Sequence, residues 1–173
     1  MTTDIGAAVT AGTYAIDTVR SQIRFTSAHV FGLSPVTGTC MLRDGTITIA
    51  SDPAGCAASA RMDAASLTTG DARRDKSVWS KRFLHVQEYP DMRFASGRLA
   101  RHGDRWLLHG ELTVRGATAP TKLELSSADA DDGDCRFHAR ARIDRQAYGV
   151  GPRGIIGRYI EVELDVVGHA VSR

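Results

Sequence analysis

The stretch that decides the fold runs from Arg136 to Ile143 and reads RFHARARI. Phe, Ala, Ala and Ile occupy every second position, and Arg or His fills each position between them. Because successive side chains of a β-strand point to opposite faces of a sheet, this alternation predicts a strand with one buried face. Residues 106–114 (WLLHGELTV) and 160–166 (IEVELDV) repeat the pattern, which indicates an antiparallel sheet with one solvated side.

The same alternation extends outward from these strands in both directions. It recurs near 13–17, 22–29, 36–42 and 122–125. The chain therefore carries about eight strands. Since closure removes the exposed edges of a sheet that has one buried face, we predict an all-β fold, an eight-stranded antiparallel β-barrel.

Short turns and a single domain complete this prediction. Asp44-Gly45 has the composition of a hairpin turn, and residues 101–104 and 131–134 predict two further turns. A chain of 173 residues fits one domain. We expect residues 12–171 to form the barrel domain and residues 1–11 to be a disordered N-terminal tail.

One segment breaks the alternation, from about residue 66 to residue 89 (SLTTGDARRDKSVWSKRFLHVQEY). Thr69 or Asp71 is suited to cap the start of a helix, and Pro90 ends the segment. Apolar residues spaced roughly for one helical face follow: Val78, Phe83 and Val86. The sequence predicts one or two short helices inserted between strands, covering one end of the barrel.

Composition argues against several classes of protein. The formal net charge is +2, and aromatic residues make up 6% of the chain. Basic residues at 136, 140 and 142 face acidic ones at 161, 163 and 165 in the expected register, so cross-strand ion pairs are predicted and nucleic acid is not an expected partner. The opening residues lack a basic n-region and an apolar run, and no stretch approaches the length of a membrane helix, which predicts a cytoplasmic protein.

Motifs that carry chemistry are missing from the sequence. No Gly-x-Ser-x-Gly, HExxH or glycine-rich phosphate loop occurs, so we predict no enzymatic activity, metal or cofactor. Cys40, Cys56 and Cys135 are odd in number and widely spaced. We expect three small buried thiols there, in preference to a disulfide or a zinc site.

The residues that share the inward face mix large and small side chains. The large ones are Phe25, Met92, Phe94, Leu112, Phe137 and Ile143. The small ones are Gly38, Cys40, Ala58, Ala60, Ala139 and Ala141. An eight-stranded barrel is just wide enough either to be filled by side chains or to hold one ligand, and composition leaves both open. A glycine can equally mark a bend or bulge.

The order of short motifs resembles the YceI-like family of polyisoprenoid-binding proteins, from about Gly12 to Ala170. The motifs are Tyr14-x-Ile16-Asp17-x-x-x-Ser21-x-Ile23-x-Phe25, Ser66-x-x-Thr69-Gly70, Arg74-Asp75-x-x-Val78-x-Ser80-x-x-Phe83, Tyr89-Pro90-x-Met92-x-Phe94-x-Ser96, Gly110-x-Leu112-Thr113-Val114-Arg115-Gly116-Ala117-Thr118-x-Pro120 and Ile143-Asp144-Arg145-x-x-Tyr148-Gly149. The resemblance implies a lipocalin-like barrel with a long internal cavity for isoprenoid chains such as polyprenyl phosphates or quinones. Two departures stand out: Arg20 replaces a common His, and the signal peptide of many members is missing.

With this resemblance, the inward set becomes a set of candidate ligand contacts. The expected cavity residues are Ile23, Phe25, His29, Val36, Trp79, Phe83, Met92, Phe94, Leu112, Phe137 and Ile143. His29 is either a core histidine bonded to a backbone carbonyl or a donor to a quinone carbonyl or phosphate oxygen.

A basic run in the inserted segment is the second candidate site. Its arginines are Arg73, Arg74 and Arg82, accompanied by Lys76 and Lys81. They form either the solvated face of a helix or a rim that meets an anionic head group or an anionic membrane surface.

We therefore expect non-catalytic binding, storage or transport of an isoprenoid lipid or another long-chain amphiphile. Transient membrane contact is compatible with that role, and the sequence leaves a homodimer open. The alternatives are a small lipid-modifying enzyme and a filled barrel that acts as a protein-interaction module.

Overall fold

The computed structural model describes residues 8–29, 34–154 and 156–171, and for residues 28 and 29 it describes the backbone alone. Nine β-strands make up most of this part of the chain. They are β1 (Gly12–Ile16), β2 (Gln22–His29), β3 (Val36–Ile49), β4 (Ala57–Thr68), β5 (Asp91–His102), β6 (Arg105–Val114), β7 (Ala117–Asp131), β8 (Asp134–Asp144) and β9 (Ile156–Ala170). The helical pieces are α2 (Ala72–Trp79) and the 3₁₀ turns η1 (Pro53–Gly55) and η2 (Arg145–Tyr148).

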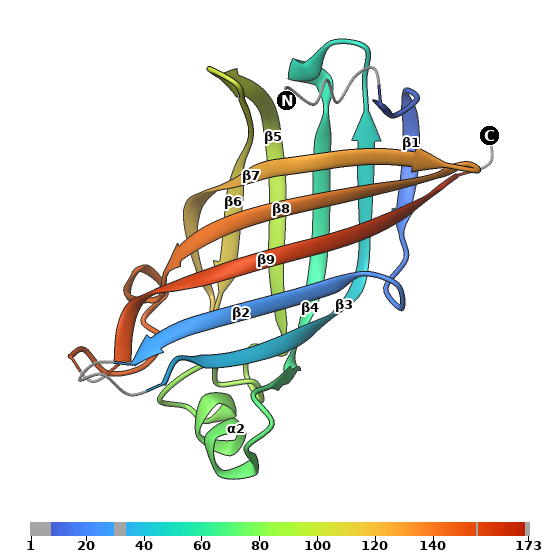
Figure 1. Cartoon of the computed structure of the whole chain (residues 1–173). Helices are drawn as coiled ribbons and strands as arrows, with labels where there is room; N and C mark the ends of the chain where they lie inside the picture. The colour runs from blue at the N-terminus through green and yellow to red at the C-terminus, as the bar shows by residue number, and fades with distance from the viewer. Residues whose placement is uncertain (1–7, 30–33, 155, 172–173) are drawn as a thin grey trace.

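The strands close into an antiparallel barrel, which confirms the predicted fold. Their order is β1-β3-β2-β9-β8-β7-β6-β5-β4, and a further β3–β4 pairing joins the two ends. Both β1 and β2 pair with β3 and β9, at different positions along those strands. The two short strands thus lie end to end, so the nine strands fill eight positions around the barrel. Figure 1 shows β7, β8, β9 and β2 crossing β4, β5 and β6 at a steep angle, with the interior between them.

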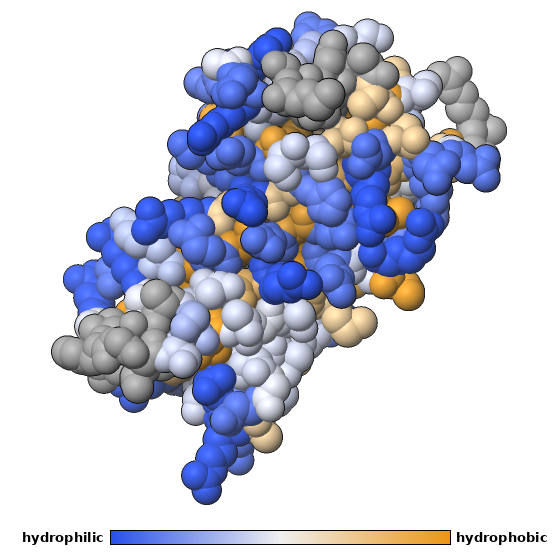
Figure 2. Space-filling view, viewed as in Figure 1, coloured by the Kyte–Doolittle hydropathy of each residue, from blue (hydrophilic) through white to orange (hydrophobic). Residues whose placement is uncertain are grey.

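On β8 and β9 the charged residues lie on the outer face of the barrel, as the alternation of the sequence predicted, and they are neighbours across the two strands. Arg140 pairs in register with Glu163, and Arg142 with Glu161. The nitrogen–oxygen distances of these ion pairs are 3.7 and 3.2 Å, and Arg136 contacts Asp165 at 2.9 Å. The predicted cross-strand ion pairs are therefore confirmed. Figure 2 shows a face on which hydrophilic residues predominate, as outward positions require.

The predicted turns divide into two that are confirmed and one that is wrong. The β5–β6 and β7–β8 hairpins turn at 103–104 and 132–133, where Gly103, Asp132 and Gly133 adopt positive φ. Asp44 and Gly45 instead lie inside β3, at a register shift against β4. A side chain at Gly45 would meet Ile16 Cδ1 at 2.4 Å, so the glycine allows β1 to approach closely.

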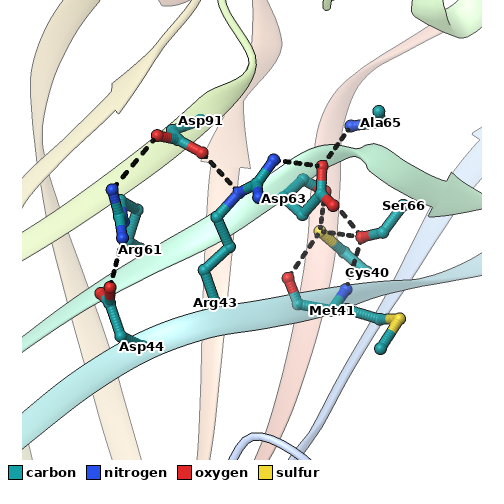
Figure 3. Close-up of polar contacts among 9 residues, drawn as sticks. All are labelled: Cys40, Met41, Arg43, Asp44, Arg61, Asp63, Ala65, Ser66 and Asp91. Carbon is teal, nitrogen blue, oxygen red and sulfur yellow. Dashed lines mark hydrogen bonds and ion pairs between the residues drawn. The ribbon is translucent and has the colours of Figure 1, made fainter.

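An ion-pair network on the outside joins β3, β4 and β5, as Figure 3 shows. Arg43 contacts both Asp63 (3.1 Å) and Asp91 (2.6 Å), and Arg61 pairs with Asp44 as well as with Asp91. The β4 residues from 64 to 67 bulge out of the ladder here, since the pairing jumps from Thr39–Thr68 to Met41–Asp63.

The hydroxyl of Ser66 replaces backbone pairing inside this bulge. Its oxygen accepts a hydrogen bond from the Met41 backbone N–H (2.8 Å) and donates one to the Asp63 carbonyl (2.6 Å). The ion pairs and this serine together hold the strands where the regular ladder is interrupted.

The predicted insertion is present but shorter than expected, because β4 continues to Thr68. The Asp71 side chain caps α2 by accepting from the Arg74 backbone N–H at 3.0 Å. Asp75, which is buried, accepts hydrogen bonds from the hydroxyls of Thr68 (2.7 Å) and Thr69 (2.6 Å) and so ties the helix to the end of β4. Figure 1 places α2 at one end of the barrel, where β4 ends and β5 begins.

A polar cluster joins the start of β8 and the end of β9 to the residues that follow β1. The His169 ring contacts Asp134 through Nδ1 and Asp17 through Nε2, both at 2.6 Å. Hydrogen bonds first to Asp134 and then to Asp17 raise the pKa of His169. The pKa of Asp17 is lowered by the Arg20 backbone N–H and by His169, and that of Asp134 by His169 and by the Arg20 side chain. Arg20, which replaces the His expected from the resemblance, belongs to this cluster because its guanidinium contacts Asp134 at 2.9 Å.

The ordered domain begins before Gly12, earlier than we expected. Val9 is 2% exposed and belongs to the main hydrophobic core, and the Tyr14 hydroxyl donates to the Thr10 carbonyl at 2.6 Å. Residues 8–11 therefore pack on the barrel. Among the described residues, helices of the length and hydropathy that a bilayer crossing demands do not occur.

Candidate ligand-binding cavity

An apolar cavity of about 450 Å³ runs through the barrel. This volume lies within the range of about 300–1,000 Å³ that is typical of small-molecule sites. Inward side chains such as Ile23, Phe25, Val162 and Leu164 line it, yet they remain only half-buried. Apolar side chains that face inward would be fully buried in a filled core, so the interior of this barrel is open.

Small inward residues have two different consequences. Cys40, Ala139 and Ala141 line the cavity and leave space for it. Gly38 does not, because the Phe25 ring covers it, with Cζ 2.3 Å from where a Cβ would be. The inward glycine therefore accommodates an aromatic ring of the neighbouring strand.

The structure places nine of the eleven candidate contacts on the cavity wall. They are Ile23, Phe25, Val36, Phe83, Met92, Phe94, Leu112, Phe137 and Ile143. Trp79 does not line the cavity, because its indole N–H donates to the Leu67 carbonyl at 2.8 Å and holds the ring beside β4. The side chain of His29 lies outside the described residues.

The basic run of the inserted segment is only partly at the cavity. All three arginines are exposed, but only Arg74 lines the cavity, together with Ser77 and Val78 of α2. The hydroxyl of Ser77 is used within the helix, where it donates to the Arg73 carbonyl at 3.2 Å. Helix α2 and the residues after it thus form one end wall of the cavity, to which this segment contributes one arginine, Arg74.

Polar groups that the sequence did not bring forward also lie at this end. Arg145, 4% exposed, and Tyr148, 5% exposed, line the cavity from η2. Ser27 lines it from β2, and its hydroxyl is buried without a hydrogen-bond partner. The alternation of β8 could have identified Arg145, because inward residues occupy every second position from Phe137 to Ile143 and Arg145 is the next such position.

Burial shifts the pKa values of titratable groups on the cavity wall. Burial raises the pKa of the Cys40 thiol to about 11, so this cavity residue stays protonated and unreactive at neutral pH. Desolvation lowers the pKa of Arg145, which nonetheless keeps its charge. Within the described ranges, His, Cys, Asp and Glu side chains form no group that could hold a metal ion.

Comparisons with known proteins agree with this geometry. A model of the YceI-like domain matches residues 14–168. The chain is 34% identical over 153 residues to Protein YceI of Escherichia coli O157:H7, covering 84% of this chain and 79% of that protein.

Solved structures show the same fold at lower identity. BcnA of Burkholderia cenocepacia superposes with a TM-score of 0.74 at 21% identity, over 88% of this chain and 98% of that one. A domain of Saccharophagus degradans, described as polyisoprenoid-binding and implicated in plant cell wall breakdown, gives 0.69 at 17% identity, over 91% and 98%.

Proposed function

The chain belongs to the YceI-like family, and we propose that it binds one isoprenoid lipid or similar long-chain amphiphile in its barrel, without catalysis. The observation that carries this proposal is the apolar cavity, whose wall combines half-buried side chains such as Ile23 and Val162 with buried ones such as Phe94 and Phe137. The similarity to a polyisoprenoid-binding domain supports an isoprenoid as the occupant.

Desolvation of the tail supplies most of the affinity in this account. Burying one CH₂ group contributes about 0.8 kcal/mol, so a chain of many carbons gains far more than one head-group contact. Selectivity should then be loose in chain chemistry and depend on how much chain the cavity accommodates. Storage or carriage of a lipid fits such binding, and a cytoplasmic location remains our expectation.

The inserted segment covers the end of the barrel through which we expect the ligand to enter the cavity. Helix α2 packs on the barrel through few contacts, chiefly with the end of β4, and it covers one end of the cavity. We propose that this segment is a lid and that Arg74 meets an anionic head group at the mouth. Arg73 and Arg82 remain candidates for contact with that head group or with an anionic membrane surface, as does a homodimer for the assembly.

The two alternatives have less support from the site. A protein-interaction module built on a filled barrel conflicts with the open interior. A lipid-modifying enzyme would need a reactive group at the wall, and the Cys40 thiol there stays protonated.

A chain-length series tests the proposal. Prenyl alcohols of increasing length would compete with a fluorescent prenyl probe, and affinity should rise steeply with each isoprene unit and then level off when the cavity is full. Lipid recovered after incubation should be chemically unchanged. Affinity that does not depend on chain length would refute binding in the cavity, and a modified lipid would favour an enzyme.

A further inference from the structure

The cavity is not uniform along its length. Near η1 it is lined by Ile49, Cys56 and Ala57, whereas the end below α2 receives Arg145 and Tyr148 from η2. In a 3₁₀ turn, residues three apart lie on the same side, so η2 presents these two side chains together. The charged side chains of the wall, Arg74 and Arg145, thus lie at one end.

Arg145 is a buried cation without a buried anion beside it. Its guanidinium donates to three backbone carbonyls, those of Val150 (2.8 Å), Ile156 (2.8 Å) and Gly157 (2.9 Å). These bonds use three of the five N–H groups of a guanidinium. No carboxylate of the described residues lies within ion-pair distance of it, and the neighbouring Asp144 is engaged by Arg158 at 2.8 Å.

Tyr148 adds a second unused donor. Its hydroxyl forms no hydrogen bond with any described residue, and although the residue as a whole is 5% exposed, the hydroxyl oxygen itself remains accessible. A buried charge usually has a partner, because leaving it unpaired costs free energy. A cation with spare donors and a hydroxyl without a partner, both on the wall of a cavity, indicate that a ligand atom completes them.

We propose that Arg145 and Tyr148 bind the anionic head group, a phosphate or carboxylate, of a single-headed amphiphile whose tail extends toward η1. This inference rests on the proposed function and adds the charge of the ligand and its direction in the barrel. An anion beside Arg145 would offset the desolvation of the buried guanidinium, and hydrogen bonds to charged groups are stronger than neutral ones. A neutral head group would leave that charge uncompensated.

The test compares two ligands with the same chain, geranylgeranyl phosphate and geranylgeraniol. The wild-type protein should bind the phosphate about tenfold to a hundredfold more tightly, and high salt should leave this preference largely intact because a buried contact is weakly screened. In Arg145→Gln most of the preference should be lost, leaving only the several-fold part that we assign to Arg74, while the alcohol still binds. Tyr148→Phe, which removes only the hydroxyl, should reduce the preference several-fold.

Arg142→Gln is the matched control, since it removes a guanidinium from the outer face of the adjoining strand β8, where Arg142 pairs with Glu161 at 3.2 Å. It should leave the preference unchanged. If Arg145→Gln does not fold, Tyr148→Phe and the salt series still decide the matter. Equal affinity for both ligands, or a preference that salt abolishes, would overturn the inference and leave the proposed function standing. Binding of neither ligand would overturn the proposed function itself.

Discussion

Replacing Ala139 by Trp should block the cavity without unfolding the barrel. Ala139 and Ala141 both lie on the inner face of β8 and line the cavity. If the indole displaces one five-carbon isoprene unit of the ligand, the lost burial is about 4 kcal/mol at about 0.8 kcal/mol per carbon. This loss corresponds to several-hundred-fold weaker binding, at about 1.4 kcal/mol per factor of ten.

The same substitution reports on the interior itself. In a filled core an added indole would overpack and cost about 1–3 kcal/mol or more of folding stability, whereas an open cavity accepts it. We therefore expect Ala139→Trp and Ala141→Trp to unfold in urea near the wild-type midpoint and to lose binding of a fluorescent prenyl probe. Arg140→Trp, between them on the outer face, is the matched control and should bind normally.

Two outcomes would refute the reasoning. If both inward variants bind the probe as tightly as the wild type does, the ligand lies elsewhere. If both unfold while the outward control is stable, the interior is packed and the cavity is not available to a ligand.

Further predictions concern the lid, the mouth, a pH-dependent contact and one glycine. Amide hydrogen exchange in α2 should be faster than in the strands and should slow when lipid is added, and equal protection in both states would contradict a lid. Arg74→Glu should weaken a prenyl phosphate several-fold and a neutral quinone hardly at all, with Arg98→Glu, an exposed arginine of β5 that does not line the cavity, as the control; equal losses for both ligands would indicate damaged packing. The two carboxylate partners of His169 raise its pKa in the folded protein. The contribution of protonated His169 to folding stability should therefore be complete below the pKa of an unfolded imidazole, and it should be lost as the pH rises through the pKa of His169 in the folded protein. The pKa values of Asp17 and Asp134 are lowered, so their contribution to folding stability should be lost as the pH falls through their pKa values in the folded protein. The urea midpoint should therefore decline at both acidic and alkaline pH, and His169→Gln should abolish the alkaline decline. Gly38→Ala should destabilise the barrel by about 1–3 kcal/mol in urea unfolding, since its Cβ would collide with the Thr68 carbonyl oxygen of β4 as well as with the Phe25 ring, and an unchanged midpoint would show that both move at no cost.

The inward set could be predicted because alternation is a local property of a strand. Residues such as Phe137 and Ala139 need only their own strand to define which face they occupy. The parity change between Leu42 and Ile47 is different, because either a hairpin turn or a bulge produces it. The structure has a bulge, and Gly45 is explained only by the approach of β1, a contact distant in sequence.

Site residues outside the strands were harder to predict. The direction of Trp79 depends on the Leu67 carbonyl, which accepts its indole N–H. Arg145 follows the inward parity of β8, but a charged residue is expected outside unless something compensates its burial, and three backbone carbonyls that no local pattern reveals provide part of that compensation.

Native mass spectrometry of protein purified without detergent, before and after incubation with a long-chain prenyl phosphate, tests the central claim most directly. We expect one lipid bound per chain, retained by the wild type and by Arg140→Trp and absent from Ala139→Trp. The mass of the bare chain in every spectrum, or a lipid bound equally by Ala139→Trp, would contradict a lipid held inside the barrel.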